Sequence, residues 1–237
     1  MMRIQVIPNT GEARTDQFLH KTTVVIDVLR ATSTIVTALA EGASGVLPVE
    51  TVMEAKTLHR QGDLLGGERF CRKIAGFDLG NSPCDYQSGA VYGRRVLLTT
   101  TNGTRAIHKA GRSDHVLAGS LLNAEACAAA AALLRRDIVM FCAGTHDEFA
   151  FEDGLCAGLL IDRLLRITGE ETETDDLGLA MLGFYRSNAD SIPEALLRSA
   201  SGRRLTKLGY AQDVTFCSQI DLFDAVPRLS GDTMTIV

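Results

Sequence analysis

An apolar run of β type passes through a short polar loop directly into a helical pattern in Val24-Val25-Ile26-Asp27-Val28-Leu29-Arg30-Ala31-Thr32-Ser33-Thr34. The same design recurs in Val96-Leu97-Leu98-Thr99-Thr100-Thr101-Asn102-Gly103-Thr104. It occurs a third time where Ile138-Val139-Met140-Phe141-Cys142-Ala143-Gly144-Thr145 leads to Phe151-Glu152-Asp153-Gly154. We call these segments the first, second and third junctions. In a parallel α/β sheet such junctions meet at the carboxyl edge, where helix N-termini present unpaired N–H groups to an anion. The sequence therefore predicts a ligand site at that edge.

Strand-length apolar runs alternate with helical patterns along the chain. Several runs lack the polar alternation of a half-exposed sheet, which predicts strands covered on both faces. We expect a three-layer α/β/α fold with a largely parallel or mixed central sheet, in a single domain spanning residues 1–237. The expected strands lie near residues 3–7, 23–28, 45–49, 95–100, 115–118 and 137–142, and the expected helices near 32–41, 51–61, 104–110, 121–135 and 152–167.

Two segments depart from this alternation. Residues 62–93 are rich in glycine and contain few periodic runs, so we expect a loop-rich excursion of the kind that often carries function. Residues 169–176 are acidic and contain no apolar side chain, which predicts a solvated surface connector. Amphipathic segments at 177–188 and 192–200 and a tail over 214–237, strand-like from 233, complete the chain.

The composition excludes several classes of protein. With 237 residues, of which 46% are hydrophobic, the chain can bury a sizeable core. A net charge of -5 and the lack of a Lys or Arg run argue against nucleic-acid binding. No window approaches the roughly 20 apolar residues of a membrane helix, and no secretory signal is present, so we expect a cytoplasmic protein that does not bind membranes. Six cysteines without a CxxC pair indicate reduced thiols rather than a zinc site.

The common signatures of phosphate and hydrolase chemistry are absent from the sequence. It contains no GxxxxGK[ST] loop, no GxGxxG after a strand, no HExxH and no GxSxG. No second aspartate stands two residues after Asp27, so the haloacid dehalogenase pattern is missing as well. Any phosphate chemistry must use another arrangement.

The first junction carries the strongest candidates. Asp27 follows an apolar run, where a carboxylate is costly unless it is paired or binds a cation. Arg30 offers a planar fork suited to phosphate or sulfonate, and Thr32 and Ser33 add hydroxyls at the helix start. A plain Asp27–Arg30 salt bridge with an ordinary threonine cap remains the alternative.

The second junction contains no acid, so it suits an anion rather than a metal. Thr101, Asn102, Gly103 and Thr104 stand where strand gives way to helix. Asn-Gly permits positive φ, which would let successive N–H groups converge into an anion nest. An ordinary turn is the alternative, because Asn-Gly is frequent in turns.

The third junction supplies Thr145 and a pair of acids, Glu152 and Asp153, at a helix start. The helix dipole alone favours acids there, which is the simpler explanation. Mg²⁺, however, prefers one or two carboxylates together with waters and phosphate oxygens. Asp27 with Glu152 or Asp153 would provide that set.

The glycine-rich segment adds three candidates. Glu68 follows a short apolar run and is a candidate base or ligand, while Asn81 and Ser82 are candidate substrate contacts. Each residue taken alone is more typical of a structural role.

Taken together, five motifs resemble the 2-phosphosulfolactate phosphatase family, in order and over most of the chain: residues 27–34, Gly66-Gly67-Glu68-Arg69, Gly76-Phe77-Asp78-Leu79-Gly80-Asn81-Ser82-Pro83, Thr100-Thr101-Asn102-Gly103-Thr104, and Cys142-Ala143-Gly144-Thr145 with Glu152-Asp153. The resemblance implies a Mg²⁺-dependent phosphatase with an α/β/α fold. Its reaction would convert 2-phosphosulfolactate, a small phosphorylated acid, to sulfolactate and phosphate in the route to coenzyme M.

The expected catalytic residues are Asp27, Arg30 and Glu68, with Mg²⁺ held by Asp27 and an acid of the Glu152–Asp153 pair. Water activated by Glu68 would attack the phosphate, and a covalent aspartyl-phosphate at Asp27 is the rival mechanism. A phosphatase of another small 2-phospho acid and a non-catalytic binding module for phosphorylated or sulfonated acids are the alternative functions. Arg69, Arg105 and Lys73 are the nearest expected cations for a sulfonate, and homo-oligomerisation is left open.

Overall fold

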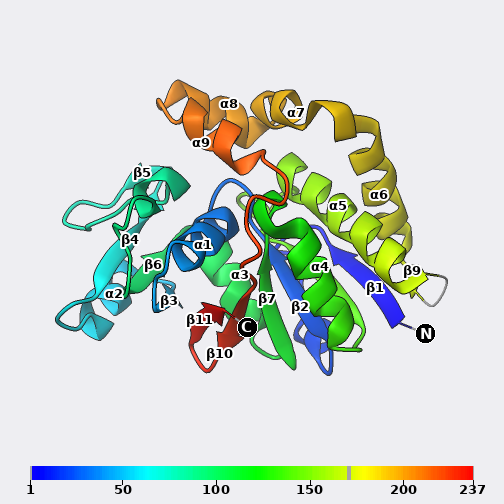
Figure 1. Ribbon diagram of the computed structural model, residues 1–237, viewed down its shortest axis with the longest axis horizontal. Helices are drawn as coiled ribbons and strands as arrows, with labels where there is room; N and C mark the ends of the chain where they lie inside the picture. Colours follow the sequence, from blue (N-terminus) through cyan, green and yellow to red (C-terminus); the bar gives the residue numbers. More distant parts are fainter. Residues whose placement is uncertain (1, 170–171, 237) are drawn as a thin grey trace.

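The computed structural model describes residues 2–169 and 172–236, and its strands form one eleven-stranded sheet flanked by helices (Figure 1). The strand order is β5-β4-β6-β3-β11-β10-β7-β2-β8-β1-β9. The strands are β1 (Met2–Ile7), β2 (Thr22–Ile26), β3 (Gly45–Val49), β4 (Leu64–Arg69), β5 (Arg72–Lys73), β6 (Arg95–Thr99), β7 (His115–Gly119), β8 (Ile138–Cys142), β9 (Thr172–Thr174), β10 (Pro227–Ser230) and β11 (Thr233–Ile236).

The helices connect these strands and, in the C-terminal part, follow one another without strands between them. They are α1 (Ala31–Ala40), α2 (Val52–Leu58), α3 (Gly103–Ala110), α4 (Ala124–Leu133), α5 (Phe151–Thr168), α6 (Asp176–Asn188), α7 (Ile192–Arg198), α8 (Ala200–Lys207) and α9 (Ala211–Cys217), with short 3-10 turns η1 (Thr15–Phe18), η2 (Pro83–Tyr86), η3 (Leu121–Asn123) and η5 (Ala189–Ser191). The expected helices at 32–41, 51–61, 104–110, 121–135 and 152–167 are confirmed in position, with shifted ends.

The sheet consists of two parallel halves joined by a hairpin. Strands β4, β6 and β3 pair in parallel, and so do β7, β2, β8, β1 and β9. The β10–β11 hairpin pairs antiparallel with both halves, through Met234 opposite Val46 and Arg228 opposite Leu117. The expected largely parallel or mixed sheet is confirmed, and the last strands of the chain lie in its middle.

Both faces of the central strands are buried. In β2, Val24 and Ile26 pack into one apolar cluster and Val25 into the other. Since successive side chains of a strand point to opposite faces, this pattern requires a covering layer on each side. Helices α4 and α5 contribute to the first cluster, and α1 and α3 to the second. The three-layer α/β/α arrangement is therefore confirmed.

Helix α1 is buried along residues 31–39, although its sequence is rich in threonine and serine. The hydroxyls bond to backbone carbonyls: Ser33 Oγ donates to Val28 O at 2.8 Å, Thr34 Oγ1 to Asn81 O at 3.0 Å, and Thr37 Oγ1 to Ser33 O at 2.8 Å. Buried polar groups satisfied in this way cost little. The helix can therefore lie in the interior with its N-terminus at the first junction.

The loop-rich prediction for residues 62–93 is wrong for β4, which pairs in parallel with β6. Two glycines, Gly66 and Gly67, concealed the strand, because glycine is depleted in strands. Here the glycine serves close approach: Gly67 has φ +138°, and a Cβ on it would stand 2.0 Å from Thr99 O.

The prediction of a solvated connector over residues 169–176 is also wrong in part. Thr172–Thr174 forms β9 beside β1. Asp175 accepts hydrogen bonds from Val6 N at 3.1 Å and from Gly178 N at 2.8 Å, so it caps α6 and ties it to the sheet.

Residues 170–171 and 237 lie outside the described residues, and the single domain over 1–237 stays a prediction. Helices α8 and α9 were not expected as separate elements.

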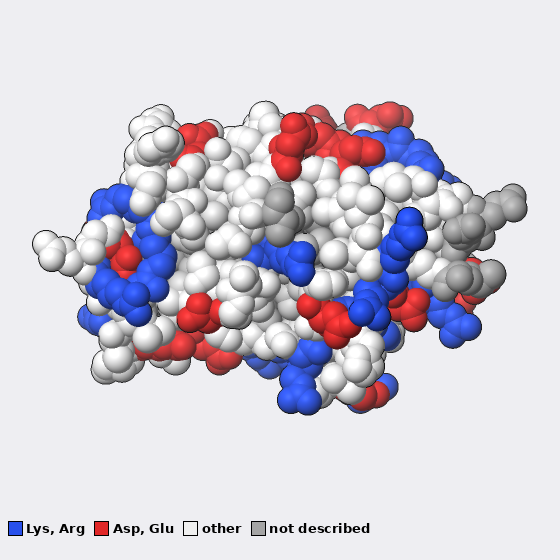
Figure 2. Space-filling view, turned by 60° about the horizontal axis from the view of Figure 1, so that its bottom comes forward, with Lys and Arg blue, Asp and Glu red and all other residues white. Residues whose placement is uncertain are grey.

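The surface carries mixed charge. On the face turned forward in Figure 2, clusters of Lys and Arg are interrupted by Asp and Glu and by uncharged surface. Among the described helices, none combines the length and apolar character needed to cross a membrane.

The position of the β10–β11 hairpin in the middle of the sheet can be tested by substitution. Met234 in β11 is fully buried, so Met234→Ala is expected to lower the free energy of unfolding by about 2–5 kcal/mol, measured by urea titration. Ile236 lies on the same strand but is 51% exposed, and Ile236→Ala should cost no more than about 1 kcal/mol. Equal effects of the two substitutions would contradict the central position of the hairpin.

Candidate functional site

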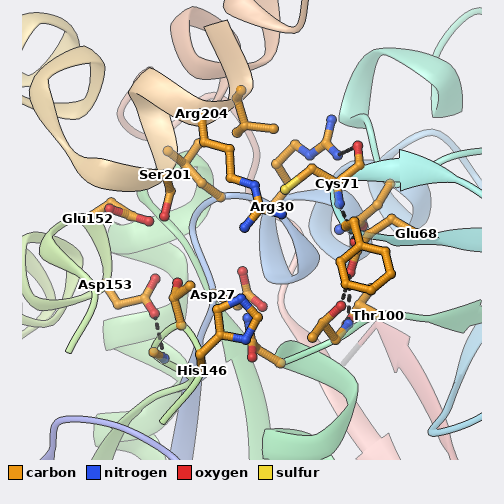
Figure 3. A pocket seen from close by; sticks show the side chains of 18 residues that line it. Asp27, Arg30, Glu68, Cys71, Thr100, His146, Glu152, Asp153, Ser201 and Arg204 are labelled. Atoms are coloured by element: carbon orange, nitrogen blue, oxygen red, sulfur yellow. Dashed lines mark hydrogen bonds between the residues drawn. The ribbon is translucent and has the colours of Figure 1, made fainter. Parts of the chain in front are cut away.

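The three junctions meet around one cavity, together with the β4–β5 turn and helix α8 (Figure 3). The first and third junctions follow β2 and β8 in one half of the sheet, and the second follows β6 in the other. The sequence predicted that the three junctions converge. It did not predict that they come from two separate halves of the sheet. The lining residues are Asp27, Leu29, Arg30, Glu68, Phe70, Cys71, Asn81, Thr100, Thr101, Asn102, Gly144, Thr145, His146, Glu152, Asp153, Ser201, Arg204 and Leu205.

Asp153 joins the first junction to the third. It stands in the first turn of α5 and is almost fully buried. One carboxylate oxygen accepts a hydrogen bond from Val28 N at 2.9 Å, and the other accepts one from Gly144 N at 3.0 Å. Burial, and next the charges of Asp27 and Glu152, hold the pKa of Asp153 well above its usual range.

Asp27 lies beside Asp153 at the end of β2. Its Oδ1 accepts a hydrogen bond from Ala31 N at 3.2 Å, and its backbone is fixed by Thr32, whose Oγ1 accepts from Asp27 N at 2.9 Å. Burial raises the pKa of Asp27 to about 7, and the nearby charges of Glu68 and Glu152 act in the same direction. A raised pKa of this kind is typical of carboxylates at functional sites.

Arg30 is not the partner of Asp27. Its Nη1 donates to Asp213 Oδ2 at 2.5 Å, its Nη2 donates to Cys71 O at 3.0 Å, and its guanidinium carbon lies 4.6 Å from the centre of the Tyr210 ring. Asp213, fully buried in α9, also accepts a hydrogen bond from Ser82 Oγ at 2.7 Å. The alternative of an Asp27–Arg30 salt bridge is therefore wrong.

The acids of the first and third junctions have no cationic partner in the part of the chain that the structure describes. Asp27, Glu152 and Asp153 take part in no ion pair within the described residues. Glu152, 2% exposed, makes no side-chain hydrogen bond to any residue that the structure describes. Buried, unpaired carboxylates are costly, and a bound cation would offset that cost.

This donor set fits Mg²⁺. Over residues 2–169 and 172–236, no group of three or more His, Cys, Asp or Glu side chains is arranged to enclose a metal ion. Mg²⁺ needs only one or two carboxylates when waters and substrate oxygens complete its shell. Asp27 with Glu152 or Asp153 meets that requirement.

The second junction presents unpaired N–H groups. Within the described chain, the N–H groups of Asn102 and Gly103 have no hydrogen-bond acceptor, while Thr104 N donates to Thr100 Oγ1 at 3.1 Å. The predicted role of Gly103 in permitting positive φ is wrong, because Asn102 has φ -116° and Gly103 is not among the described residues with positive φ. Gly103 provides space instead: a Cβ there would stand 2.3 Å from Ala31 Cβ and 2.6 Å from Asp27 Oδ2. The missing side chain lets the N-terminus of α3 approach Asp27.

Glu68 connects the β4–β5 turn to the second junction. Its Oε1 accepts hydrogen bonds from Thr101 N and Thr101 Oγ1, both at 2.8 Å, and its Oε2 accepts one from Cys71 N at 2.7 Å. The carboxylate therefore fixes two segments of the cavity wall, whatever chemistry it performs.

The predicted site residues divide into two groups. Those that line the cavity are Asp27, Arg30, Glu68, Asn81, Thr101, Asn102, Thr145, Glu152 and Asp153. Those that are not among its lining residues are Thr32, Ser33, Ser82, Gly103 and Thr104. Thr32 and Thr104 bond to the lining residues Asp27 and Thr100, whereas Ser82 bonds to Asp213, the acid that fixes Arg30. Direct ligand contact by this second group stays a prediction.

The expected sulfonate cations are engaged outside the cavity wall. Arg69 donates to Thr99 Oγ1 at 3.0 Å, Arg105 pairs with Asp147 at 2.9 Å, and Lys73 donates to Asp78 O at 2.8 Å. None of the three lines the cavity.

Sequence reasoning did not single out Ser201 and Arg204 on α8 or His146 in the turn after the third junction, although all three line the cavity. It also missed Asp213 on α9, which bonds to Arg30. None of the three helical residues follows a strand, so the pattern that identified the junctions contains no signal for them.

The chain is similar to known proteins over most of its length. A family profile described as 2-phosphosulpholactate phosphatase matches residues 9–232. A probable 2-phosphosulfolactate phosphatase of Caldanaerobacter subterraneus subsp. tengcongensis is 43% identical over 216 residues, covering 90% of this chain and 89% of the relative. A protein of the same description from Thermotoga maritima is 44% identical over 209 residues, covering 88% and 89%. Another, from Clostridium novyi, is 38% identical over 237 residues, covering 99% and 100%.

The space at Gly103 generates a prediction. Gly103→Ala is expected to lower the free energy of unfolding by about 1–3 kcal/mol, because the added methyl group overlaps Ala31 and Asp27. Gly183→Ala in α6 is the matched control: nothing lies within 4 Å of its added Cβ, so helix propensity should raise stability by about 0.5–1 kcal/mol. Denaturant unfolding measures both variants. A stabilising Gly103→Ala would contradict the close approach of α3 to Asp27.

Proposed function

We propose, since the chain belongs to the 2-phosphosulpholactate phosphatase family, that it is a Mg²⁺-dependent phosphatase converting 2-phosphosulfolactate to sulfolactate and phosphate. One observation carries the proposal beyond family membership: buried carboxylates without cationic partners among the described residues and the open N-terminus of α3 border the same cavity. A role in coenzyme M biosynthesis, which the resemblance implies, is part of the proposal.

Asp27 and one acid of the Glu152–Asp153 pair would hold the metal. Asp153 already accepts hydrogen bonds from two backbone N–H groups, so Glu152 has fewer contacts with the protein than Asp153. A bound Mg²⁺ would supply positive charge opposite the phosphate.

Arg30 and the N–H groups of Asn102 and Gly103 would bind the phosphate oxygens. Negative charge accumulates on the equatorial oxygens during phosphoryl transfer, and donors fixed in advance stabilise it without reorganisation. Asp213 fixes the guanidinium of Arg30, so this donor is oriented before substrate binds. Its fork then meets the anion in one orientation.

Glu68 is the candidate base that would take a proton from the attacking water. Asn81, Thr101 and Thr145 line the same cavity and are candidate substrate contacts. The rival mechanism forms an aspartyl-phosphate at Asp27. Trapping with a phosphate mimic, followed by mass analysis of the Asp27 peptide, separates the two, because only the rival leaves a covalent adduct.

A substrate panel tests the function itself. Phosphate release is measured from 2-phosphosulfolactate and from 2-phospho acids without a sulfonate, each with and without Mg²⁺. Release that requires Mg²⁺ and is greatest with 2-phosphosulfolactate is expected. Preference for a sulfonate-free acid would indicate another 2-phospho acid phosphatase, and binding without release would indicate a binding module.

Asp27 provides a direct test of the metal. Asp27→Asn is expected to abolish Mg²⁺-dependent phosphate release while the protein stays folded, since the amide oxygen still accepts from Ala31 N. The measurements are phosphate release and circular dichroism. Glu148→Gln is the control, because Glu148 is an exposed acid in the adjacent turn that does not line the cavity. Full activity of Asp27→Asn would exclude the metal-ligand role.

The pH dependence of Mg²⁺ binding gives another test. The pKa of Asp27 is about 7 in the folded protein, whereas its ordinary value is 3.8. The folded, metal-free protein therefore holds this proton more tightly than the unfolded chain does, and the free energy of unfolding falls as pH rises from about 4 to about 7. Metal competes with the proton, so Mg²⁺ should raise the melting temperature more at about pH 8 than at about pH 5.5. Asp27→Asn should remove most of this pH-dependent increment. A Mg²⁺ effect equal at both pH values would argue against Asp27 as a ligand.

A further inference from the structure

Two arginines line the cavity, and their contacts differ. Arg30 is buried and bonded to Asp213 and Cys71, whereas the guanidinium of Arg204 has no hydrogen-bond or ion-pair acceptor among the described residues. Figure 3 shows the two side chains close together at the α8 end of the cavity, with Asp27 and Asp153 lower in the view. Arg204 is therefore a cation without a protein counter-ion in the described part of the chain.

Ser201 lies on the same face of α8 as Arg204. The two residues are three positions apart, which places them on neighbouring turns of one helix face. Both line the cavity, and Ser201 Oγ has no hydrogen-bond partner within the described residues. This face thus offers a hydroxyl and a guanidinium to a ligand.

Helix α8 is held firmly in place. Ser199 Oγ caps it by accepting from Gly202 N at 2.9 Å, and Leu205 is buried in the core. At Gly202 a Cβ would stand 1.9 Å from Leu196 O, so α8 packs closely against α7. The hydroxyl and guanidinium are consequently presented from a fixed element rather than from a mobile loop.

We infer that Ser201 and Arg204 form the subsite for the sulfonate of the substrate, an inference that rests on the proposed function. Among the described residues that line the cavity, Arg30 and Arg204 are the only arginines and no lysine is present. Since Arg30 is assigned to the phosphate, Arg204 is the lining cation that remains for a second anion. The α8 end supplies the unused donors. A guanidinium fork matches an anion with several oxygens in a plane or a tetrahedron.

The chemistry of the substrate assigns the sulfonate, rather than the carboxylate, to this end. The carboxylate of 2-phosphosulfolactate is attached to the carbon that bears the phosphate ester, so it stays beside the phosphate and the metal ligands. The sulfonate is one carbon further away. Sulfonate oxygens are weak ligands for Mg²⁺, so their recognition depends on N–H and O–H donors.

Three phosphate esters separate the anionic groups: 2-phosphosulfolactate, 2-phospholactate, which lacks the sulfonate, and 2-sulfoethyl phosphate, which lacks the carboxylate. Arg204→Met should lower kcat/KM for the two sulfonates about tenfold to a hundredfold, chiefly through KM. It should leave 2-phospholactate within about twofold of the parent. Arg204→Lys should recover part of the loss, because the charge remains while the fork is lost, and Ser201→Ala should cause a smaller loss in the same direction.

Arg203→Met is the matched control. Arg203 precedes Arg204 on α8 and is exposed like it, but it does not line the cavity and donates to Arg198 O, so the same loss of charge occurs away from the site. It should leave the preference for sulfonates unchanged. An equal effect of Arg203→Met and Arg204→Met would show a general charge effect and overturn the inference.

The remaining outcomes are also decisive. If Arg204→Met lowers kcat/KM only for the two esters that carry a carboxylate, Arg204 contacts the carboxylate. If it lowers kcat/KM equally for all three esters, Arg204 contacts the phosphate. Either result overturns the inference, and so does an unchanged kcat/KM for all three. If the parent releases phosphate from none of the esters, the proposed function fails. Calorimetric binding of sulfolactate against lactate, in the parent and in Arg204→Met, then tests the subsite separately, and equal binding in both proteins overturns it.

Discussion

The carboxylates of Asp27, Glu152 and Asp153 share a buried region without a cationic partner among the described residues, and the surrounding structure is organised around that fact. The effective cost of burying an ion is several kcal/mol even after relaxation. Backbone N–H groups of Val28, Gly144 and Ala31 offset part of it. The remainder of that cost is what the proposed Mg²⁺ would offset.

The second junction contributes the opposite electrostatic character. It brings no acid, and its helix N-terminus carries partial positive charge. Gly103 allows this N-terminus to approach Asp27 more closely than any side chain would permit. The acids proposed to hold a metal and the N–H groups proposed to bind an anion are therefore adjacent, although they come from different halves of the sheet.

The local part of this arrangement could be predicted from the sequence. An apolar run followed by polar residues and a helical pattern identifies a strand–helix junction, because each element has its own period and its own capping residues. Asp27, Glu152 and Asp153 were found in this way. Gly103 was found but misinterpreted: it serves a close contact rather than a positive φ, and only tertiary packing distinguishes the two.

Residues on α8 and α9 could not be found by that pattern. Asp213 matters because it binds Arg30, 183 positions earlier in the chain, and Ser82, 131 positions earlier. Arg204 matters because α8 forms part of the cavity wall. Such roles depend on where short helices dock, and neither propensity nor spacing encodes that position locally.

The order of the strands has a consequence for how the protein is made on the ribosome. Translation delivers the two halves of the sheet first, and the hairpin that joins them, β10–β11, emerges last. Domains generally fold as units, and contacts between distant segments form slowly. A nascent chain that ends before the C-terminal helices lacks the acid that orients Arg30 and the helix that bears Arg204, so an incomplete product cannot assemble the cavity. Assembly of the site therefore depends on the docking of α8 and α9.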